Sequence, residues 1–353
     1  MNLKEKILSK SNSYNHYKEN YEMSKDEIEL LKDEINNLKS DKQLSLKEEF
    51  LKTYEDAISF CNRKYMDFYL SDDFEDKLME ITNHLDKESK DKFKLYFLRA
   101  LFVNMIRQDS LYSKDELSDQ KLFKDFKNTQ TSENKVGQYK FFGEYNTHAF
   151  IDLKLNEDEK EFLKDKDIID AGAFTGDTSI PLSKITKKNI YAFEPFKDSF
   201  DLLKMNIEAN NIKNIIPINK SLGNINGNRT LYLSKNNVQG ICSDSNIRPY
   251  DEEIQVEETT IDSFVKENNL KVGYITIDVE GAEMDLLEGA INTIKSQKPI
   301  LCISIYHKVS DYFDIIPWIA NLGLDYEFEI FKEQPWPFLA DTMVKCTVKK
   351  TTF

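Results

Sequence analysis

The spacing of apolar residues predicts a helical first part of the chain. Up to about residue 130 the sequence contains neither glycine nor proline and is rich in Lys, Glu, Leu and Asp. Apolar positions at intervals of three and four predict amphipathic helices, and these cover residues 46–70, 74–85 and 90–106. We therefore expect an all-α N-terminal domain over residues 1–130, without catalytic residues.

One helical segment, residues 23–40, has a narrower apolar stripe. Its residues Ile28, Leu31, Ile35 and Leu38 are spaced three, four and three apart, which is the seam of a coiled coil. The stripe lasts less than two heptads, so two interpretations stay open. The helix either packs on its own domain or forms a short coiled-coil oligomerisation helix, and on the second interpretation we expect a homo-oligomer.

From about residue 165 short apolar runs alternate with helical patterns. The predicted strands are 166–170, 190–193, 215–219, 274–277 and 300–306. The predicted helices between them are 177–185, 197–210, 260–267 and 282–296. Such alternation is typical of an α/β doubly wound sheet, and we assign residues 131–353 to this second domain.

The end of the chain follows a different pattern. Two strand-like runs, 325–331 and 341–349, flank a Pro-Trp-Pro segment. Consecutive strands joined by a turn usually pair as an antiparallel hairpin, so we expect a hairpin at the end of the sheet.

Composition narrows the classes of partner. The 353 residues carry a formal net charge of -14, which repels phosphate backbones, so nucleic acid is not an expected partner. The four cysteines are far apart in sequence and form no zinc or redox motif. The N-terminus has no apolar run after its charges, and no stretch of 18 apolar residues occurs, so we expect a cytoplasmic protein without a membrane span.

The segment from Asp170 to Thr178, DAGAFTGDT, is a candidate cofactor site. A predicted buried strand runs into a glycine-containing turn and then into a helix. Gly172 would allow close approach of a ligand, and Gly176 would relieve crowding at the start of the helix. The unpaired N–H groups of a helix start and the carboxylate of Asp170 can both bind a ligand. The candidate residues of this segment are Asp170, Gly172, Ala173, Phe174, Gly176 and Thr178.

The next predicted strand ends at Glu194, which lies 24 residues after Asp170. An acidic residue at this place commonly accepts hydrogen bonds from both hydroxyls of a ribose. A dinucleotide site would have the pattern G-x-G-x-x-G, but Phe174 occupies the position of the middle glycine and would crowd a pyrophosphate. S-adenosylmethionine (SAM), which has no phosphate, does not need that close approach.

A second acidic segment follows the predicted strand 274–277. Asp278 and Glu280 come at its end, with Glu283 one helical turn further on. In doubly wound folds this end of a strand faces the ligand crevice. These carboxylates could act as a base, hold polar substrate groups or bind a cation. Glu283 could equally be a helix-start residue favoured by the helix dipole.

The strand 300–306 is followed by His307, a candidate general base near neutral pH. A structural histidine is the competing interpretation. We place His307 first among the catalytic candidates and keep Asp278 and Glu280 as alternatives. A metal ion is not expected.

Together these motifs resemble the FkbM-type SAM-dependent methyltransferases, over about residues 140–350. The resemblance is carried by DAGAFTGDTS at 170–179, YAFEPF at 191–196 and TTIDSF at 259–264, and continues in YITIDVEGAEMDLLEGA, KPILCISIYHK and DTMVKC. It implies a class I methyltransferase sheet, Rossmann-like, with seven strands and a C-terminal antiparallel hairpin.

The resemblance also implies roles for individual residues. Asp170, Gly172, Ala173 and Gly176 would line the methionine part of SAM, and Glu194 would hold its ribose. Pro195 and Phe196 would lie beside the adenine, which Asn219 to Ser221 would approach from the edge. Asp278 would lie near the transferring methyl group.

Members of this family typically O-methylate hydroxyls of sugars, glycans or natural products, with S-adenosylhomocysteine (SAH) as the product. We therefore expect a small-molecule or glycan acceptor. Three alternatives stay open: N-methylation of an amine or of an amino acid attached to a glycan, a non-catalytic SAM-binding or scaffold protein, and an NAD-dependent oxidoreductase.

Overall fold

A computed structural model describes residues 68–69, 71–102, 121–122, 125, 135–143, 153–234, 241–245, 247, 249–332 and 341–348. The expected oligomerisation helix at 23–40 lies outside this part of the chain. The chain forms two compact units, and the larger one contains residues 80–99 and 108–353. In the smaller unit the ring of Phe74, at the start of helix α5 (Phe74–His84), packs edge-on against Phe68 and Tyr69.

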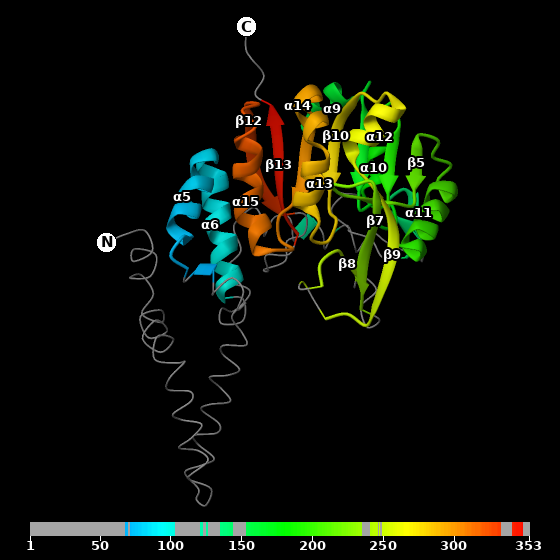
Figure 1. The fold of residues 1–353 in the computed structure, drawn as a ribbon. Coiled ribbons are helices and arrows are strands. Elements are labelled where there is room, and N and C mark those ends of the chain that lie inside the picture. Colours follow the sequence, from blue (N-terminus) through cyan, green and yellow to red (C-terminus); the bar gives the residue numbers. More distant parts are fainter. Residues whose placement is uncertain are drawn as a thin grey trace, which may run out of the picture. The chain divides into compact units, whose positions relative to one another are not determined.

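A seven-stranded sheet forms the centre of the larger unit, in the order β12-β13-β11-β10-β3-β4-β5 (Figure 1). Five of its strands are parallel: β3 (Asp167–Ala171), β4 (Ile190–Phe193), β5 (Ile215–Ile218), β10 (Val272–Ile277) and β11 (Ile300–Ser304). The mixed α/β fold expected from the sequence is confirmed. Every residue of β3, β4, β10 and β11 is buried, as is usual for parallel strands covered on both faces.

The last two strands, β12 (Tyr326–Lys332) and β13 (Thr342–Val348), pair with each other in antiparallel register, and β13 also pairs with β11. The expected C-terminal hairpin is therefore present at the margin of the sheet.

The helices of the larger unit connect and cover the strands. They are α9 (Glu157–Leu163), α10 (Ser179–Leu182), α11 (Lys197–Ala209), α12 (Ile261–Asn268), α13 (Glu283–Gly289), α14 (Ile291–Gln297) and α15 (Val309–Ala320). Two predictions of helix extent were wrong. The helix expected over 177–185 is a single turn, and the helix expected over 282–296 is divided in two at Ala290.

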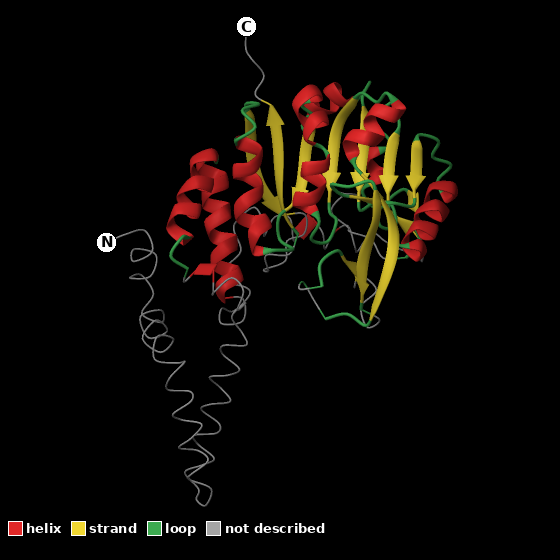
Figure 2. Ribbon diagram, viewed as in Figure 1, coloured by secondary structure: helices red, strands yellow, loops and turns green. Residues whose placement is uncertain are grey.

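A second, four-stranded sheet was not predicted. It contains β6 (Ser221–Leu222), β7 (Gly227–Leu233), β8 (Ile241–Cys242) and β9 (Glu252–Thr259), in the order β6-β9-β7-β8. It is inserted between β5 and α12. Figure 2 shows its strands extending from the edge at which the parallel strands end. A short hairpin of β1 (Lys135–Val136) and β2 (Tyr139–Lys140) was also not predicted.

The outer strand β12 is covered by part of the N-terminal helical segment. Leu85 forms an isolated bridge with Phe328, and the backbone N–H of Ile330 donates to the Ser89 hydroxyl at 3.2 Å. Further along helix α6 (Lys87–Phe102) the Phe93 ring stacks on Tyr312 of α15, with ring centres 4.3 Å apart. These residues belong to the larger unit; the separate helical domain over 1–130 stays a prediction. Among the described helices none is both long and apolar enough to cross a membrane.

Candidate active site

A cavity of about 210 Å³ opens where β3, β4 and β10 end. Both acidic segments and the glycine turn contribute to its wall. Of the residues expected from the sequence, those that line the cavity are Asp170, Gly172, Phe174, Thr178, Glu194, Pro195, Ser221, Asp278 and Glu280. The sheet therefore brings together motifs that lie up to about 110 residues apart in the chain, as expected for the carboxyl edge of a doubly wound sheet.

The turn after β3 has a tightly constrained backbone. Gly172, Phe174 and Gly176 all have positive φ, at 85°, 46° and 94°. The N–H groups of Gly172 and Ala173 both donate to the carbonyl of Phe193, which ties the turn to the end of β4. Glycine is the residue that adopts such angles without strain, whereas Phe174 has to be held there by its surroundings.

The two glycines of this turn serve packing. A Cβ atom on Gly172 would lie 1.8 Å from the carbonyl oxygen of Asp278, so this glycine permits close approach of the β10 end. The sequence predicts that Gly172 allows close approach of a ligand. In the structure the first constraint on this residue is the nearby backbone of Asp278. A Cβ atom on Gly176 would lie 2.8 Å from Leu203 of α11, which agrees with the expected relief of crowding at the helix start.

Asp170 and Glu194 are buried carboxylates at the floor of the cavity. Asp170 accepts a 2.5 Å hydrogen bond from Ser179, and burial raises its pKa to about 7. Glu194 accepts from the backbone N–H of Phe174 at 2.9 Å and of Phe196 at 2.8 Å. Burial raises the pKa of Glu194 to about 8 against the effect of these two hydrogen bonds. Each carboxylate keeps oxygen lone pairs for a ligand.

Four residues expected to contact the cofactor do not line the cavity. One of them, Asn219, donates from its side chain to the carbonyls of Glu194 and Pro195. Ala173 is fully buried in the core, and neither Gly176 nor Phe196 is part of the cavity wall. Their contribution is through the backbone. Gly176 begins the short helix α10 by accepting from Ile180, and the N–H of Phe196 holds one oxygen of Glu194.

The turn after β10 brings its acidic residues toward one histidine. Asp278 is joined to β3 through its N–H, which donates to the carbonyl of Ala171 at 3.0 Å, and Glu280 has a positive φ of 53°. Glu283, fully buried at the start of α13, accepts from the N–H groups of Val279 and Gly281. Glu283 is therefore more than a residue favoured by a helix dipole, because it fixes the conformation of the acidic turn.

His307 lies between three carboxylates. Its Nδ1 is 2.8 Å from Glu283, and its Nε2 is 3.4 Å from both Asp278 and Glu280. Burial alone would lower its pKa, but these carboxylates outweigh burial and raise the pKa of His307 to about 10. The imidazole would then already hold its proton at neutral pH. His307 is also absent from the cavity wall, so its expected role as a general base stays a prediction that this geometry does not favour.

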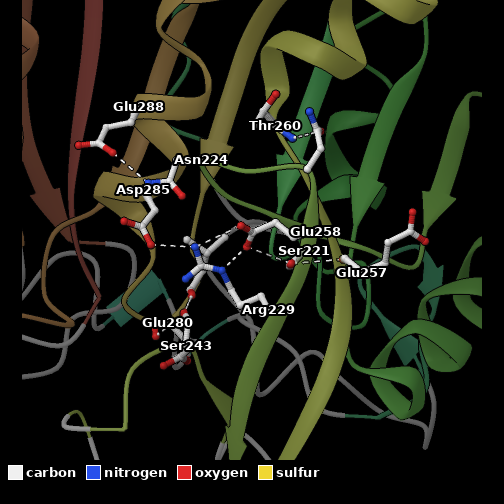
Figure 3. A network of polar contacts seen from close by, with 12 residues as sticks. Ser221, Asn224, Arg229, Ser243, Glu257, Glu258, Thr260, Glu280, Asp285 and Glu288 are labelled. Atoms are coloured by element: carbon white, nitrogen blue, oxygen red, sulfur yellow. Dashed lines mark hydrogen bonds and ion pairs between the residues drawn. The ribbon is translucent and has the colours of Figure 1, made fainter.

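The inserted sheet forms the opposite wall of the cavity through Arg229, Leu231, Ile241, Cys242 and Ser243. Figure 3 shows how it is fastened. The Arg229 guanidinium pairs with the buried carboxylate of Glu258 and, at 2.8 Å, with Asp285 of α13. Ser243 donates from its N–H to the carbonyl of Glu280 at 3.0 Å, and from its hydroxyl to that of Val279 at 2.7 Å. The inserted sheet is therefore joined directly to the acidic turn.

Several residues of the cavity wall were not predicted from the sequence. Arg229 lies in the insertion, and nothing in the local sequence marks it. Tyr306 and Asp341 could have been found from the sequence. Tyr306 directly precedes the candidate His307, and Asp341 is the first residue of the last motif of the family resemblance. Burial raises the pKa of Asp341 to about 6, with the nearby Asp278 acting in the same direction. Lys220 falls within the range 219–221 expected beside the adenine. The remaining wall residues, which were not predicted individually, are Asp177, Phe193, Ser199, Leu222, Leu231, Ile241, Cys242, Ser243, Thr276, Val279, Ala282 and Met343.

Comparison with known proteins identifies the family. Residues 170–328, which span the glycine turn, the inserted sheet and the acidic turn, match the family described as the methyltransferase FkbM domain. Over these residues the chain is similar to the FkbM methyltransferase domain. The family resemblance expected from the sequence motifs is thus confirmed.

One curated protein and several solved structures are similar to parts of this chain. A protein named Methyltransferase 1 from Beauveria bassiana (strain ARSEF 2860) is 30% identical over 162 residues, which span 40% of this chain and 65% of that protein. The crystal structure of a methyltransferase FkbM from Methylobacillus flagellatus KT is 18% identical, with a TM-score of 0.49, and covers 77% of this chain and 58% of that one. An rRNA methylase from Streptococcus thermophilus is 16% identical, with a TM-score of 0.35, over 54% of this chain and 92% of that one.

Proposed function

We propose that the protein is a SAM-dependent methyltransferase that transfers a methyl group to a hydroxyl of a sugar, a glycan or a related small polar metabolite. The observation that carries the proposal is Glu194, a buried carboxylate in the cavity wall at the end of β4. It stands where a ribose diol is held in nucleotide-binding sheets, beside a turn in which Phe174 excludes the backbone approach that a pyrophosphate needs.

The residues present fit SAM in charge as well as in position. Asp170, Glu194 and Asp278 line the cavity with Phe174 and Pro195. The carboxylates suit the hydroxyl, ammonium and sulfonium groups of SAM, and the apolar rings suit its adenine. Bound SAM would supply a methyl group on a sulfonium sulfur; attack by the acceptor oxygen forms the O–CH3 bond, breaks the S–CH3 bond and leaves SAH.

The chain's own task is to orient the acceptor and accept its proton. Asp278, Glu280 and Asp341 line the cavity on the side of the acidic turn, and we assign the hydroxyl proton to this carboxylate group. The imidazole of His307 holds Asp278 and Glu280 in place by charge. Tyr306, also in the wall, offers an aromatic face of the kind on which sugar rings stack.

N-methylation is the second candidate, and the same carboxylates favour it. Asp278, Glu280 and Asp341 would attract an acceptor ammonium group into the cavity. After loss of a proton to a carboxylate, the amine would attack the methyl group as the hydroxyl does. Product analysis by mass spectrometry of extracts with and without the gene distinguishes the two, because an O-methyl and an N-methyl product fragment differently.

Calorimetric titration with SAM, SAH and NAD⁺ tests the cofactor assignment. We expect SAM and SAH to bind and NAD⁺ not to bind. At a pH above 8, where the Glu194 carboxylate is charged, replacing Glu194 by Gln should weaken SAM binding about 10- to 100-fold, since hydrogen bonds to a charged acceptor contribute roughly 1.5–3 kcal/mol. The control is Glu267→Gln, which alters an exposed carboxylate on α12. Binding of NAD⁺ alone, or equal SAM affinity in both variants, would contradict the assignment.

A further inference from the structure

A group of three side chains lies behind the cavity wall at the acidic turn. Asp278, Glu283 and His307 each offer one ligand atom, and these atoms lie within 4.8 Å of one another. Asp278 reaches the cavity, whereas Glu283 is fully buried and the His307 side chain is 3% exposed. Carboxylates that converge in this way are common without a bound ion, so the group needs a second observation before it indicates a metal site.

That observation is the Nε2 atom of His307. Within the described part of the chain this buried nitrogen has no hydrogen-bond partner, and the same holds for Oε2 of Glu283. A buried polar atom without a hydrogen bond is costly, and its presence in a native site calls for a missing partner. The opposite ring nitrogen, Nδ1, is fixed at 2.8 Å from Glu283, so the ring cannot turn to relieve Nε2.

The distances around Nε2 indicate what the missing partner is. Oδ1 of Asp278 and Oε2 of Glu280 each lie 3.4 Å from it. This separation exceeds the usual 2.7–3.2 Å of an N–H···O hydrogen bond. It agrees with the edge of a tetrahedron around a metal ion, since ligand bonds of about 2.1 Å place neighbouring ligand atoms about 3.4 Å apart.

We propose that His307 Nε2, Asp278 and Glu280 form a binding site for one divalent cation at the edge of the cavity. The cation replaces the proton that Nε2 carries in the metal-free chain, and that proton is released to solvent. Glu283 is a positioning residue: it accepts the Nδ1–H hydrogen bond and so points the freed Nε2 lone pair at the cation, an arrangement found around many metal-bound histidines. One imidazole and two carboxylates suit Mn²⁺ or Zn²⁺ better than Mg²⁺. Asp278 and Glu280 both line the cavity, so the remaining coordination positions face the acceptor.

The catalytic role of the cation rests on the proposed methyl transfer. The binding of the cation does not depend on that proposal. A cation at this place would bind the acceptor oxygen and lower the pKa of the hydroxyl. The proton would then pass to a carboxylate of the cavity wall, and the methyl transfer itself is unchanged. This role also accounts for three carboxylates gathered at one histidine, because a dication offsets their mutual repulsion.

Titration with Mn²⁺, followed by electron paramagnetic resonance, tests the binding. The full chain is treated with a chelator, and the loss of the free-ion signal is measured as protein is added. We expect one bound Mn²⁺ per chain, displaced by Zn²⁺. Asp278→Asn and Glu280→Gln should each weaken binding at least tenfold, and Glu283→Gln should also weaken it by disturbing His307. The control, Glu267→Gln, should bind as the unaltered chain does.

The outcomes separate this inference from the proposed function. Circular dichroism shows which variants are folded, and Glu280→Gln serves if Asp278→Asn is not folded. Absence of Mn²⁺ and Zn²⁺ binding in a chain that binds SAM overturns the cation site and leaves the methyltransferase proposal standing. Binding that is unchanged in Asp278→Asn and Glu280→Gln overturns its location. Mn²⁺ binding without SAM binding supports the site and contradicts the proposed cofactor.

Discussion

At the scale of single residues, Gly172 joins the two motifs of the site. Its φ of 85° is in the left-handed region, and a Cβ atom there would lie 1.8 Å from the carbonyl oxygen of Asp278. The contact is with backbone, which cannot move aside as a side chain can. Gly172 therefore sets the distance between the glycine turn and the acidic turn.

We expect Gly172→Ala to destabilise the protein by about 3 kcal/mol or more, because strain at positive φ adds to a steric overlap. The matched control is Gly323→Ala, at a φ of 67° with no atom within 4 Å of the added Cβ. This control isolates the cost of the backbone conformation, about 1 kcal/mol. Thermal unfolding of both variants, followed by circular dichroism, measures the difference. Equal melting temperatures would show that β3 and β10 separate easily.

The positions of Glu194 and Asp278 could be predicted, but their surroundings could not. Each follows a buried apolar strand, and the carboxyl ends of parallel strands meet at one edge. The partners of His307 could not be predicted from the sequence. Glu283 lies 24 residues before it, and Asp278 and Glu280 lie further back. A histidine at the end of a strand looks like a base until the charges that surround it in three dimensions are known.

Among the elements, the inserted sheet depends on one buried ion pair. Arg229 of β7 pairs with Glu258 of β9, whose side chain is fully buried, and with Asp285 of α13. Burial of Glu258 without Arg229 would leave a carboxylate without its counter-charge, which usually costs more than the ion pair contributes.

Replacing Arg229 by Gln should therefore destabilise the protein by about 3–5 kcal/mol. The double variant Arg229→Gln, Glu258→Gln should recover part of this loss, since it removes the buried charge as well. Urea unfolding of the single and double variants gives the coupling energy of the pair. If the double variant is no more stable than Arg229→Gln alone, the buried charge of Glu258 is not the source of the loss.

The inserted sheet also shows where sequence patterns fail. Strands β4 and β10 were found because they are continuous apolar runs. Strands β7 and β9 contain many polar residues. Strand β9 alternates between exposed and half-buried positions, and its one buried residue is the charged Glu258. Their pairing depends on long-range register, which no local pattern records. Helix α15 was missed for the opposite reason: its apolar residues surround it and Pro317 lies inside it.

At the scale of the whole molecule, the contacts of helices α5 and α6 indicate where the larger unit begins. Residues 80–99 belong to the larger unit, and Tyr312 of α15 donates to the carbonyl of Phe93 at 2.7 Å. The boundary expected at residue 130 would remove these contacts from the methyltransferase domain.

Two truncated chains test this. A chain of residues 68–353 keeps both helices, and we expect it to melt close to the full chain. A chain of residues 104–353 exposes Tyr312 and the margin of β12, and we expect it to melt at least 5 °C lower or to aggregate, because Phe93 alone contributes about 3–5 kcal/mol when buried. Light scattering on the same samples tests the expected homo-oligomer, which should be lost with residues 1–67. Equal stability of both chains would support the boundary at 130.

The chain enters and leaves the inserted sheet at neighbouring points. Strand β6 follows directly after β5 and pairs in parallel with β9, which ends where α12 begins, and the N–H of Gly223 donates to the carbonyl of Thr259. Residues 221–259 are thus a module whose two ends can keep their positions when the sequence between them is changed. Grafting this module from another member of the family would replace one wall of the cavity and leave Asp170 and Glu194 untouched. For directed evolution of acceptor choice, this module is the segment to randomise first.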